Sequence, residues 1–411
     1  TFKVRKRMDK KVVLAYSGGL DTSVIIKWLT KKGYDVIAYM ADVGQACPPF
    51  RRGSDFEVYK KRALTTGAVK VVVEDLKKEF VKDFVFKSLK AGAVYEGGYL
   101  LATALSRPII AKGLVETAHK EKAGFVAHGC TGKGNDQVRF EVSIGALAPD
   151  LKILAPVREW ELRTRAEEID YAKKNNIPID TTKKKPYSID LNLWGISIES
   201  GKLEDPYYAP DEDIYQLTKG VDKAAAEPVY VEIEFKGGVP VKLNGRAMDG
   251  VSLILKLSKI AGDAGVGRSD MIENRLVGIK SREIYEAPAA WTLFSAHKAL
   301  ESLVFDREVL HFKEAVSLKY AELTYYGLWY TPLKEALDKF VDETQKSVNG
   351  TVKVKLHKGH CIVVGRKSPD SLYKKELATY EEGDVFDQSL AKGFVQIWGL
   401  PYKGLYKGSK K

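Results

Sequence analysis

Between residues 11 and 155, short apolar runs alternate with stretches whose apolar positions recur at helical spacing. Buried parallel strands have nearly continuous apolar sequences, and the short runs fit that description. Repeats of strand, helix and strand predict an α/β domain with a doubly wound parallel sheet. The predicted strands cover residues 11–16, 34–40, 69–73, 124–128 and 152–155, and the predicted helices cover residues 22–32, 57–66, 77–90, 99–120 and 136–147.

The pattern changes after residue 162. Residues 163–227 hold a lysine run, several prolines and polar loops. Beyond them the pattern is mixed, with hairpins predicted at 229–243 and 351–364 and a helix predicted at 251–261. We therefore predict an N-terminal α/β domain over residues 1–180 and a C-terminal α+β domain over residues 181–411.

Composition narrows the classes of protein that fit this pattern. A hydrophobic fraction of 45% over 411 residues supports folded domains, and no apolar run is long enough to predict a membrane span. The basic N-terminus lacks an apolar segment, so we expect a cytoplasmic protein without a secretory signal. Cys47, Cys130 and Cys361 are too far apart for a zinc motif and indicate no disulfide framework.

The formal net charge of the chain is +12. Such a charge is compatible with a nucleic-acid partner. The basic residues are spread along the chain, however, which favours a solvated lysine-rich surface that also attracts anionic substrates. We therefore expect neither a nucleic acid nor a membrane as partner.

The first sequence motif is SGGLDTS at residues 17–23, between the first predicted strand and the first predicted helix. Its adjacent glycines let the backbone approach an anion, and the N–H groups at the helix start favour phosphate. No lysine follows the glycines, so the motif is neither a Walker A loop nor GxGxxG. A phosphate loop without a fixed lysine suits a group that leaves as pyrophosphate with a metal ion. Asp21 is placed to help hold that ion.

The second motif, AHGCTGKGNDQVRF at residues 127–140, follows another predicted strand and so lies on the same rim of the sheet. Its glycines again allow close backbone approach. Asn135 and Asp136 sit where a helix begins, and we expect their side chains to be free to bind a ligand. Arg139 follows one turn later on the same face, where a guanidinium can pair with a carboxylate through two hydrogen bonds.

Both motifs resemble those of known families. SGGLDTS resembles the SGGxD[ST] loop of the N-type ATP pyrophosphatases, which adenylate a carbonyl-type oxygen and release pyrophosphate. The string at residues 128–141 resembles the signature of the argininosuccinate synthase family. Further segments resemble that family's motifs along essentially the whole chain: YE and YLL at 95–96 and 99–101, KPYS at 185–188, GKLEDP at 201–206, GVGR at 265–268, ENR at 273–275 and KSREIYEAP at 280–288.

The resemblance implies a ligase of arginine biosynthesis with an adenine-nucleotide-hydrolase-like N-terminal domain. Such an enzyme joins L-citrulline to L-aspartate, using ATP and Mg²⁺, and gives argininosuccinate, AMP and pyrophosphate through a citrullyl-adenylate. Residues 1–180 are then the nucleotide-binding domain, and residues 181–411 bind substrates and form a homotetramer. The resemblance assigns catalytic roles to Asp21 and Asp136 and fixes no metal ligand firmly.

Site residues carry over from the family one by one. Among these residues, we expect Asp136 to bind the aspartate amine, Arg139 to bind the citrulline carboxylate and Glu273 to bind the citrulline α-amine. The expected ATP contacts are Ala15, Tyr16, Ser17, Gly18, Gly19, Leu20, Asp21, Thr22, Ser23, Ala41 and Gly129. The expected aspartate contacts are Thr131, Asn135 and Asp136. The expected citrulline contacts are Tyr99, Asn135, Arg139, Ser188, Ser197, Glu273 and Tyr285.

The chain departs from the family pattern at several positions. Ala104 stands where a serine is common, and we expect the backbone or Thr103 to replace the lost contact. Leu191 replaces an acidic residue, which weakens the polar network expected for its loop, and Glu283 replaces a glycine. Residues 46–54 form an insertion-like stretch, for which a surface loop is favoured over a regulatory or contact element. Pro401 predicts that the C-terminal helix is short or broken.

Two other functions compete with this interpretation. A tRNA-modifying adenylase, such as a thiolase, fits the basic charge and the position of Cys130 beside the second motif, but no second catalytic cysteine or added RNA-binding domain is evident. A non-catalytic ATP-binding protein fits the fold, but both glycine-rich motifs are intact, which argues against it.

Overall fold

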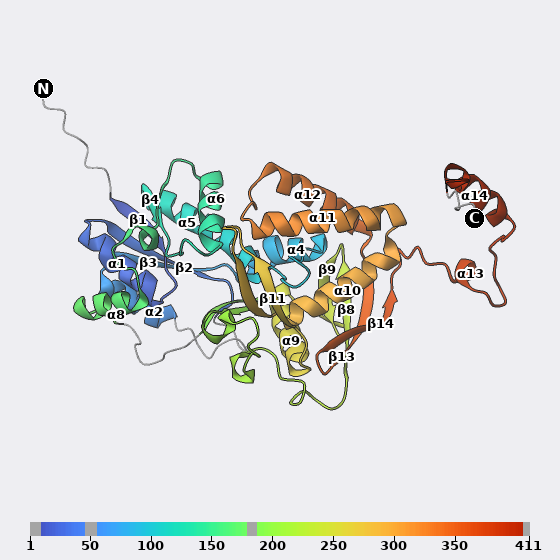
Figure 1. Ribbon diagram of the computed structural model, residues 1–411, viewed down its shortest axis with the longest axis horizontal. Coiled ribbons are helices and arrows are strands. Elements are labelled where there is room, and N and C mark those ends of the chain that lie inside the picture. The colour runs from blue at the N-terminus through green and yellow to red at the C-terminus, as the bar shows by residue number, and fades with distance from the viewer. Residues whose placement is uncertain (1–9, 46–55, 179–186, 406–411) are drawn as a thin grey trace, which may run out of the picture.

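The computed structural model describes residues 10–45, 56–178 and 187–405. Its N-terminal domain is built on a five-stranded parallel sheet in the order β3-β2-β1-β4-β5 (Figure 1). The chain order reverses between β1 and β4, which is the switch point where such sheets bind ligands. The strands are β1 (Lys11–Ala15), β2 (Asp35–Asp42), β3 (Lys70–Asp75), β4 (Phe125–Ala127) and β5 (Lys152–Leu154).

Successive residues of these strands enter two different apolar cores, because side chains alternate between the faces of a sheet. Val12 and Leu14 share one core with residues of α1, α2 and α8, whereas Val13 belongs to the core on the other face, where α5 packs on β1. Both faces are covered, which explains the continuous apolar runs. The helices are α1 (Leu20–Lys31), α2 (Phe56–Thr66), α3 (Lys77–Glu79), the π-helical η1 (Phe80–Val85), α4 (Phe86–Ala91), α5 (Ala102–Lys120), α6 (Asp136–Leu147), α7 (Pro156–Glu159) and α8 (Arg165–Lys174).

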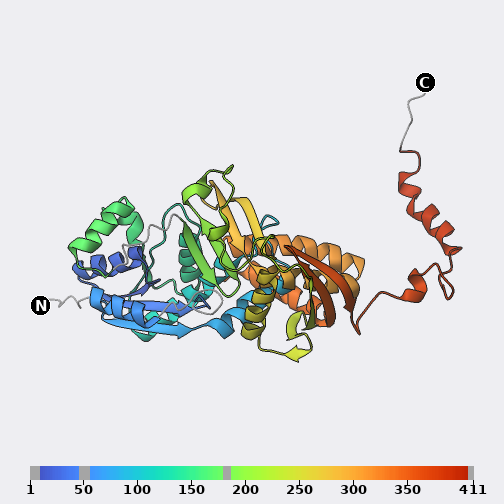
Figure 2. The same ribbon diagram turned by 90° about the horizontal axis from the view of Figure 1, so that it is seen from below.

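Two antiparallel sheets follow in the C-terminal domain. The sheet nearer the N-terminal domain has the order β11-β12-β7-β6 and the other has the order β10-β9-β8-β13-β14 (Figures 1 and 2). The first consists of β6 (Ser188–Asn192), β7 (Gly195–Glu199), β11 (Arg268–Asn274) and β12 (Lys280–Glu286). The second consists of β8 (Val229–Lys236), β9 (Val239–Leu243), β10 (Arg246–Ala247), β13 (Gly350–His357) and β14 (His360–Lys367).

Four long helices pack beside these sheets, and two of them begin with an aspartate cap. Asp249 accepts a hydrogen bond from the Ser252 N–H, and Asp306 accepts one from the Val309 N–H, so each satisfies a backbone donor that the first helical turn leaves open. The long helices are α9 (Gly250–Asp263), α10 (Pro288–Val304), α11 (Arg307–Tyr325) and α12 (Pro332–Thr344). Short 3₁₀ turns are η2 (Gly201–Glu204), η3 (Glu212–Ile214) and η4 (Gln345–Ser347).

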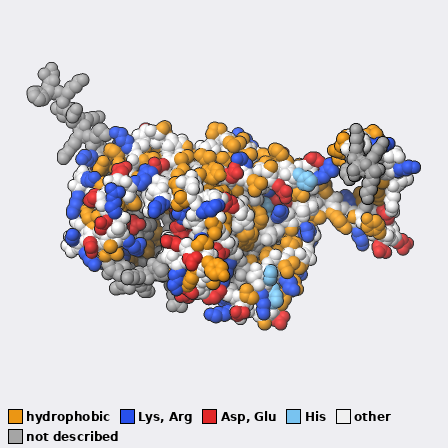
Figure 3. All heavy atoms as spheres, in the orientation of Figure 1, with side chains coloured by type: hydrophobic (Ala, Val, Ile, Leu, Met, Phe, Trp, Pro, Cys, Tyr) orange, Lys and Arg blue, Asp and Glu red, His pale blue; other side chains and the backbone are white. Residues whose placement is uncertain are grey.

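A C-terminal tail leaves the body of the protein after β14. It carries α13 (Lys375–Ala378), α14 (Leu390–Trp398) and the 3₁₀ turn η5 (Leu400–Tyr402), and it extends away from both domains in two perpendicular views (Figures 1 and 2). Its apolar side chains lie on the surface (Figure 3). The exposed ones include Leu390, Phe394, Ile397, Trp398 and Leu400.

The parallel sheet, both predicted hairpins and the α+β character of the second half are confirmed. The predicted helix at 99–120 begins too early, because Tyr99 forms an antiparallel bridge with Tyr95 and Leu101 has a left-handed φ of 65°. Elements α8, β6 and β7 lie in the segment predicted as loops. The C-terminal helix ends at Trp398, ahead of Pro401, as expected. No helix of the described residues is both long and apolar enough to cross a membrane.

Candidate active site

The SGGLDTS loop joins β1 to α1 at the switch point of the parallel sheet. Gly18 has a φ of +79°, a left-handed conformation that glycine adopts without strain. A Cβ at this position would lie only 2.6 Å from the Tyr59 ring. Hydroxyl groups brace the loop, since Tyr16 Oη and Ser23 Oγ lie 3.1 Å apart and Ser23 Oγ donates to the Gly19 carbonyl at 2.7 Å. The loop is thus a preformed turn with backbone N–H groups at the start of a helix.

Helix α2 supplies a cation to this loop that sequence reasoning missed. The Arg62 guanidinium donates through Nη1 to the Gly18 carbonyl at 2.6 Å and lies 5.6 Å from the centre of the Tyr59 ring. Tyr59 and Arg62 are three positions apart and therefore share one face of the helix. The spacing of Tyr59 and Arg62 predicts that they share a helix face. It does not predict that this face contacts the SGGLDTS loop.

A cavity of about 330 Å³ runs from the SGGLDTS loop to the second glycine-rich loop. Six of the expected ATP contacts line it, and Asp136, an expected aspartate contact, lines its other part. The carboxyl ends of β1 and β4 therefore meet at one cavity, on the rim of the sheet where both loops were predicted to lie. The six are Ala15, Tyr16, Ser17, Thr22, Ala41 and Gly129. The remaining expected ATP contacts, Gly18, Gly19, Leu20, Asp21 and Ser23, lie in the loop and the first turn of α1 without lining the cavity.

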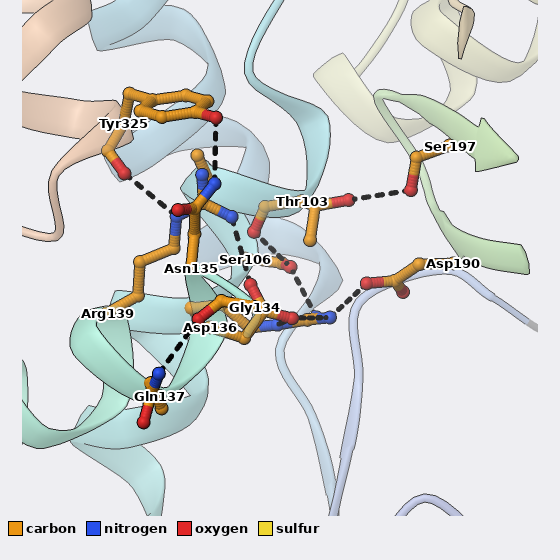
Figure 4. A network of polar contacts seen from close by, with 12 residues as sticks. Thr103, Ser106, Gly134, Asn135, Asp136, Gln137, Arg139, Asp190, Ser197 and Tyr325 are labelled. Carbon is orange, nitrogen blue, oxygen red and sulfur yellow. Dashed lines mark hydrogen bonds and ion pairs between the residues drawn. The ribbon is translucent and has the colours of Figure 1, made fainter. Parts of the chain in front are cut away.

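Asp136 begins α6 and is held by arginines from two helices. Arg107 of α5 donates through Nε to the Asp136 carboxylate at 2.9 Å and also pairs with Asp190 of β6, while Arg139 donates to Asp136 at 2.9 Å (Figure 4). Burial alone would raise the pKa of Asp136, but Arg107 and Arg139 together hold that pKa below its ordinary value. The pKa of Asp190 is raised, chiefly by burial. Asp136 is thus an ionised carboxylate in a partly buried cluster beside the cavity.

The Asn135 side chain forms hydrogen bonds with two segments of the C-terminal domain. Its Nδ2 donates to the Tyr325 hydroxyl at 2.7 Å (Figure 4). Its Oδ1 accepts from the Leu276 N–H at 2.9 Å. We expected the side chains of Asn135 and Asp136 to be free, and that expectation is wrong because both already have protein partners. The contact with Asn135 therefore joins the two domains at the second glycine-rich loop.

Arg139 is fully enclosed beneath the end of α11. Its Nε donates to the Tyr325 carbonyl at 2.9 Å, and its guanidinium lies 4.8 Å from the centre of the Tyr325 ring. The chain passes close by because Gly327 has a left-handed φ of +75°, and a Cβ there would lie 2.7 Å from the Arg139 Cα. Arg139 remains charged, since Asp136 stabilises its cation against the effect of burial.

The expected citrulline contacts Tyr99, Glu273 and Tyr285 form one cluster. Tyr285 Oη donates to Glu273 at 2.5 Å, and the rings of Tyr99 and Tyr285 stack with centres 4.2 Å apart. Tyr99 Oη in turn accepts backbone N–H groups of Thr103 and Ala104 at 2.9 and 3.1 Å. Burial raises the pKa of Glu273, and the hydrogen bonds from Tyr285 and Tyr325 oppose that shift.

The two expected serines lie on the β6–β7 hairpin. Ser197 Oγ is 3.3 Å from Thr103 Oγ1, so Thr103 provides a hydroxyl next to the position of Ala104 (Figure 4). Ser188 lies at the exposed start of β6, and among the described residues its hydroxyl makes no hydrogen bond to this cluster. Thr131 is also exposed, at the outer end of the second loop.

Glu283, one of the departures from the family pattern, is buried beside Arg275. Arg275 Nη2 donates to Glu283 at 2.7 Å and also pairs with Glu199, so one guanidinium is shared by two carboxyl groups. Burial and the nearby Glu199 raise the pKa of Glu283 to about 9. Leu191 lines the nucleotide cavity, and the polar contacts of its loop pass through Asp190 instead. The insertion-like stretch at residues 46–54 lies outside the described residues.

A doubly wound domain with a glycine-rich loop and a cavity at its switch point, closed by an antiparallel second domain, defines a two-domain nucleotide-dependent enzyme. Comparison with known families identifies it further. Residues 11–178 match the model of the arginosuccinate synthase N-terminal HUP domain, and residues 187–405 match that of the arginosuccinate synthase C-terminal domain. The chain belongs to the argininosuccinate synthase family.

Curated relatives cover nearly the whole chain. The argininosuccinate synthase of Carboxydothermus hydrogenoformans is 56% identical over 397 residues, which span 96% of this chain and 97% of the relative. That of Halalkalibacterium halodurans is 58% identical over 394 residues, spanning 96% and 94% of the two chains. That of Thermoanaerobacter sp. is 57% identical over 396 residues, spanning 96% and 95%. These comparisons confirm the resemblance found in the motifs.

Proposed function

We propose that this chain catalyses the ATP-dependent ligation of L-citrulline and L-aspartate to argininosuccinate, with release of AMP and pyrophosphate. One observation carries the proposal: the two family motifs follow adjacent strands β1 and β4, and a single cavity runs from Ser17 in one to Asp136 in the other. A nucleotide and an amino acid therefore have neighbouring places. Membership of the family supplies the identity of the substrates.

ATP would lie in this cavity with its phosphates at the SGGLDTS loop. Backbone N–H groups at the start of α1 and the helix dipole favour the phosphate charge. The hydroxyls of Ser17 and Thr22, which lie 3.1 Å apart, add donors at the same place. The adenine would lie toward Ala41, on the neighbouring strand β2.

Mg²⁺ fits beside the phosphate loop at Asp21. Helix α8 brings Glu168 to Asp21, and Glu168 Oε2 is a buried oxygen without a hydrogen-bond partner in the described structure. Burial and the adjacent Asp21 raise the pKa of Glu168 to about 8, a shift that a bound cation would reverse. No group of three metal-binding side chains occurs among the described residues, so Asp21 and Glu168 would share the ion with pyrophosphate oxygens. Mg²⁺ would neutralise charge on the departing pyrophosphate.

Aspartate would bind at the second glycine-rich loop. Asp136 is ionised and suits the aspartate ammonium group, while Thr131 and Asn135 suit a carboxylate. Asn135 has one Nδ2 hydrogen left after its bond to Tyr325. Thr131 is exposed and would reach the substrate from the outer part of this loop.

Citrulline would bind between the domains, along the cluster of Tyr99, Glu273 and Tyr285. Arg139 uses Nε and Nη1 within the protein, so Nη2 is the donor that we assign to the citrulline carboxylate. Glu273 would accept the α-ammonium group, because its ionised form gains from a cation that compensates burial. Ser197 and Ser188 would line the same ligand from the β6–β7 hairpin.

The chemistry then needs orientation rather than a protein nucleophile. The citrulline ureido oxygen attacks the α-phosphorus of ATP, pyrophosphate leaves, and a citrullyl-adenylate forms. The aspartate ammonium group first gives a proton to water, and the neutral amine attacks the activated ureido carbon. The C–O bond to AMP then breaks, AMP leaves with that oxygen, and the new C–N nitrogen releases its second proton to water. Asp136 would hold the amine in place and stabilise the charge that the amine develops, because its carboxylate lines the nucleotide cavity.

Measuring pyrophosphate release with each substrate omitted in turn tests this proposal. We expect release to require ATP and citrulline, and argininosuccinate to form only when aspartate is added. Release that ignores citrulline and requires tRNA would support the thiolase alternative instead. Burial raises the pKa of the Cys130 thiol, which keeps it protonated and opposes that alternative. ATP binding without any release would indicate the non-catalytic alternative.

We further propose a cytoplasmic homotetramer in which residues 1–180 bind nucleotide and residues 181–411 complete the amino-acid sites and assemble the subunits. The tail supports the assembly. Its helix α14 exposes Phe394 and Trp398 and buries none of its own residues within the described part of the chain, so its apolar side chains fit a surface on a second copy. The resemblance to the family is the only ground for the number of four subunits and for the location.

A further inference from the structure

Tyr325 occupies the point where the proposed aspartate and citrulline residues meet, although no motif marks it. It is the last residue of α11 and is fully buried. Its ring stacks on Tyr95 with centres 3.6 Å apart, and the Arg139 guanidinium lies 4.8 Å from the ring centre. Its hydroxyl lies 2.7 Å from Asn135 Nδ2 (Figure 4). The same hydroxyl lies 2.5 Å from Glu273 Oε1. The ring position is therefore fixed by packing, and the hydroxyl is fixed by polar partners.

The direction of these hydrogen bonds follows from the chemistry of the groups. An ionised Glu273 only accepts, so the single proton of Tyr325 Oη goes to Glu273. Tyr325 Oη must then accept from Asn135, which turns Nδ2 toward the tyrosine. The Leu276 N–H donates to Oδ1 and selects the same orientation from the other side. The Asn135 amide is thereby held with one Nδ2 hydrogen available to a ligand.

The same hydroxyl acts on Glu273. Its hydrogen bond stabilises the carboxylate form and so opposes the rise in pKa that burial causes. Tyr285 donates to Glu273 in the same way, and Arg139 and Arg275 add positive charge nearby, while Glu283 adds an opposing carboxyl group. Removing the Tyr325 hydroxyl would take one hydrogen-bond donor from Glu273 and leave its burial unchanged, so the pKa of Glu273 would rise.

We infer that Tyr325 is a positioning residue that orients Asn135 and keeps Glu273 ready for an ammonium group, so that one hydroxyl serves both amino-acid sites. The inference rests on the proposed function, which assigns Asn135 and Glu273 to the substrates. Tyr325 itself is buried behind these two side chains and acts through them. Its loss therefore raises the KM for both amino acids and leaves the KM for ATP unchanged.

Tyr325→Phe tests this inference, with Tyr330→Phe as the matched control. Tyr330 follows α11 in the same segment. Its hydroxyl also reaches the N-terminal domain, where it donates to the Pro108 carbonyl at 2.9 Å, and it contacts none of the proposed substrate-binding residues in the described structure. We expect Tyr325→Phe to raise the KM of citrulline and of aspartate about tenfold each, the effect of losing a hydrogen bond to a charged group or its partner. The acid limb of kcat/KM for citrulline should move to higher pH, because the pKa of Glu273 rises. Tyr330→Phe should change neither.

A double-mutant cycle separates positioning from loss of structure. If Tyr325 acts on aspartate through Asn135, adding Tyr325→Phe to Asn135→Ala should raise the aspartate KM no further. Additive effects, an equal rise in the ATP KM, or unchanged amino-acid KM values in Tyr325→Phe would overturn the inference. Argininosuccinate formation by the wild-type protein is measured before any variant. If the wild-type protein forms none, the proposed function fails, and the inference about Tyr325 is not what has been refuted.

Discussion

Arg107 Nε lies 2.9 Å from Asp136 Oδ2. Asp136 belongs to the second glycine-rich motif, and Arg107 lies 29 positions before it in the sequence, on helix α5. The same guanidinium pairs with Asp190 on the other domain. A planar guanidinium can bind two carboxylates in fixed directions, which a lysine cannot do. The ionised Asp136 that we assign to the aspartate amine therefore depends on Arg107.

Replacing Arg107 with lysine should weaken aspartate use selectively. The aspartate KM should rise by about tenfold or more, since a charge-assisted hydrogen bond is lost. The two arginines hold the pKa of Asp136 below its ordinary value, so its carboxylate persists as pH falls. Lysine keeps the positive charge but loses the guanidinium hydrogen bond to Asp136, which also lowers that pKa. The pKa of Asp136 should therefore rise, and the acid limb of kcat/KM for aspartate should shift to higher pH. Steady-state kinetics between pH 5 and 8 measure both effects, and an unshifted limb would contradict the role given to Arg107.

Asp136→Ala should separate the two chemical steps. We expect citrulline-dependent adenylation, followed as exchange of labelled pyrophosphate into ATP, to survive better than argininosuccinate formation. The reason is that Asp136 is assigned to the amine of the second substrate only. Equal loss of both steps would show that Asp136 also serves the first step.

Gly18→Ala should damage ATP binding more than Gly19→Ala does. Gly18 has a left-handed φ, which costs a residue with a Cβ about 1–2 kcal/mol, and its Cβ would also meet the Tyr59 ring. Gly19 has a φ of −78°, and a Cβ there would meet only Ser17 Oγ at 3.4 Å. The ATP KM of the two variants, measured with both amino acids saturating, is the readout. Equal effects would mean that the conformation of Gly18 does not organise the loop.

Glu283→Gln should change how stability depends on pH. The folded-state pKa of Glu283 is raised to about 9, so the folded protein binds this proton more tightly than the unfolded chain. Stability from that proton is fully present below the unfolded pKa and is lost as pH rises through about 9. Melting temperatures from pH 6 to 9 should therefore fall more in the wild-type protein than in Glu283→Gln. The exposed Glu343→Gln serves as control, and parallel curves for wild type and Glu283→Gln would refute the shift.

Charges placed on the apolar side chains of α14 should dissociate the proposed tetramer. Light scattering should give four times the chain mass of 45.7 kDa for the wild-type protein and a smaller mass for Phe394→Glu combined with Trp398→Glu. Lys392→Glu on the same helix is the control and should keep the wild-type mass. A wild-type protein that is monomeric, or a double variant of unchanged mass, would contradict the role of the tail.

The N-terminal domain was predictable because its chemistry is local. A buried parallel strand is apolar throughout, and the two glycine-rich loops each follow such a strand, which places them on one rim of the sheet. The order of the strands was not predictable from these patterns. It nevertheless puts β1 and β4 side by side, so the two loops meet.

Helix α8 escaped prediction because it is polar, with only Ala172 buried among its ten residues. Its one local signal was the capping box, in which Thr164 and Glu167 satisfy each other's backbone N–H groups. The strands β6 and β7 were missed because they are short and lie beside a lysine run and prolines. Strand β7 pairs with β12, which is remote in sequence, and β6 pairs with β7 at the edge of the same sheet.

The partners of the site residues were the least predictable part. Asn135 and Asp136 were expected to be free, but Tyr325 and Arg107 engage them from 190 and 29 positions away. A hydrogen bond of this kind leaves no periodic trace in the sequence. Sequence motifs therefore named the residues proposed to face the substrates, and only the fold revealed the groups that orient them.

The central claim is that the citrulline ureido oxygen attacks ATP to form an adenylate. Citrulline labelled with ¹⁸O in the ureido group tests that claim most directly, when it is incubated with ATP, Mg²⁺, aspartate and the wild-type protein. Mass spectrometry of the AMP formed should show one ¹⁸O atom per molecule, because the oxygen that bonds to the α-phosphorus leaves with it. AMP without the label, formed together with argininosuccinate, would contradict the claim.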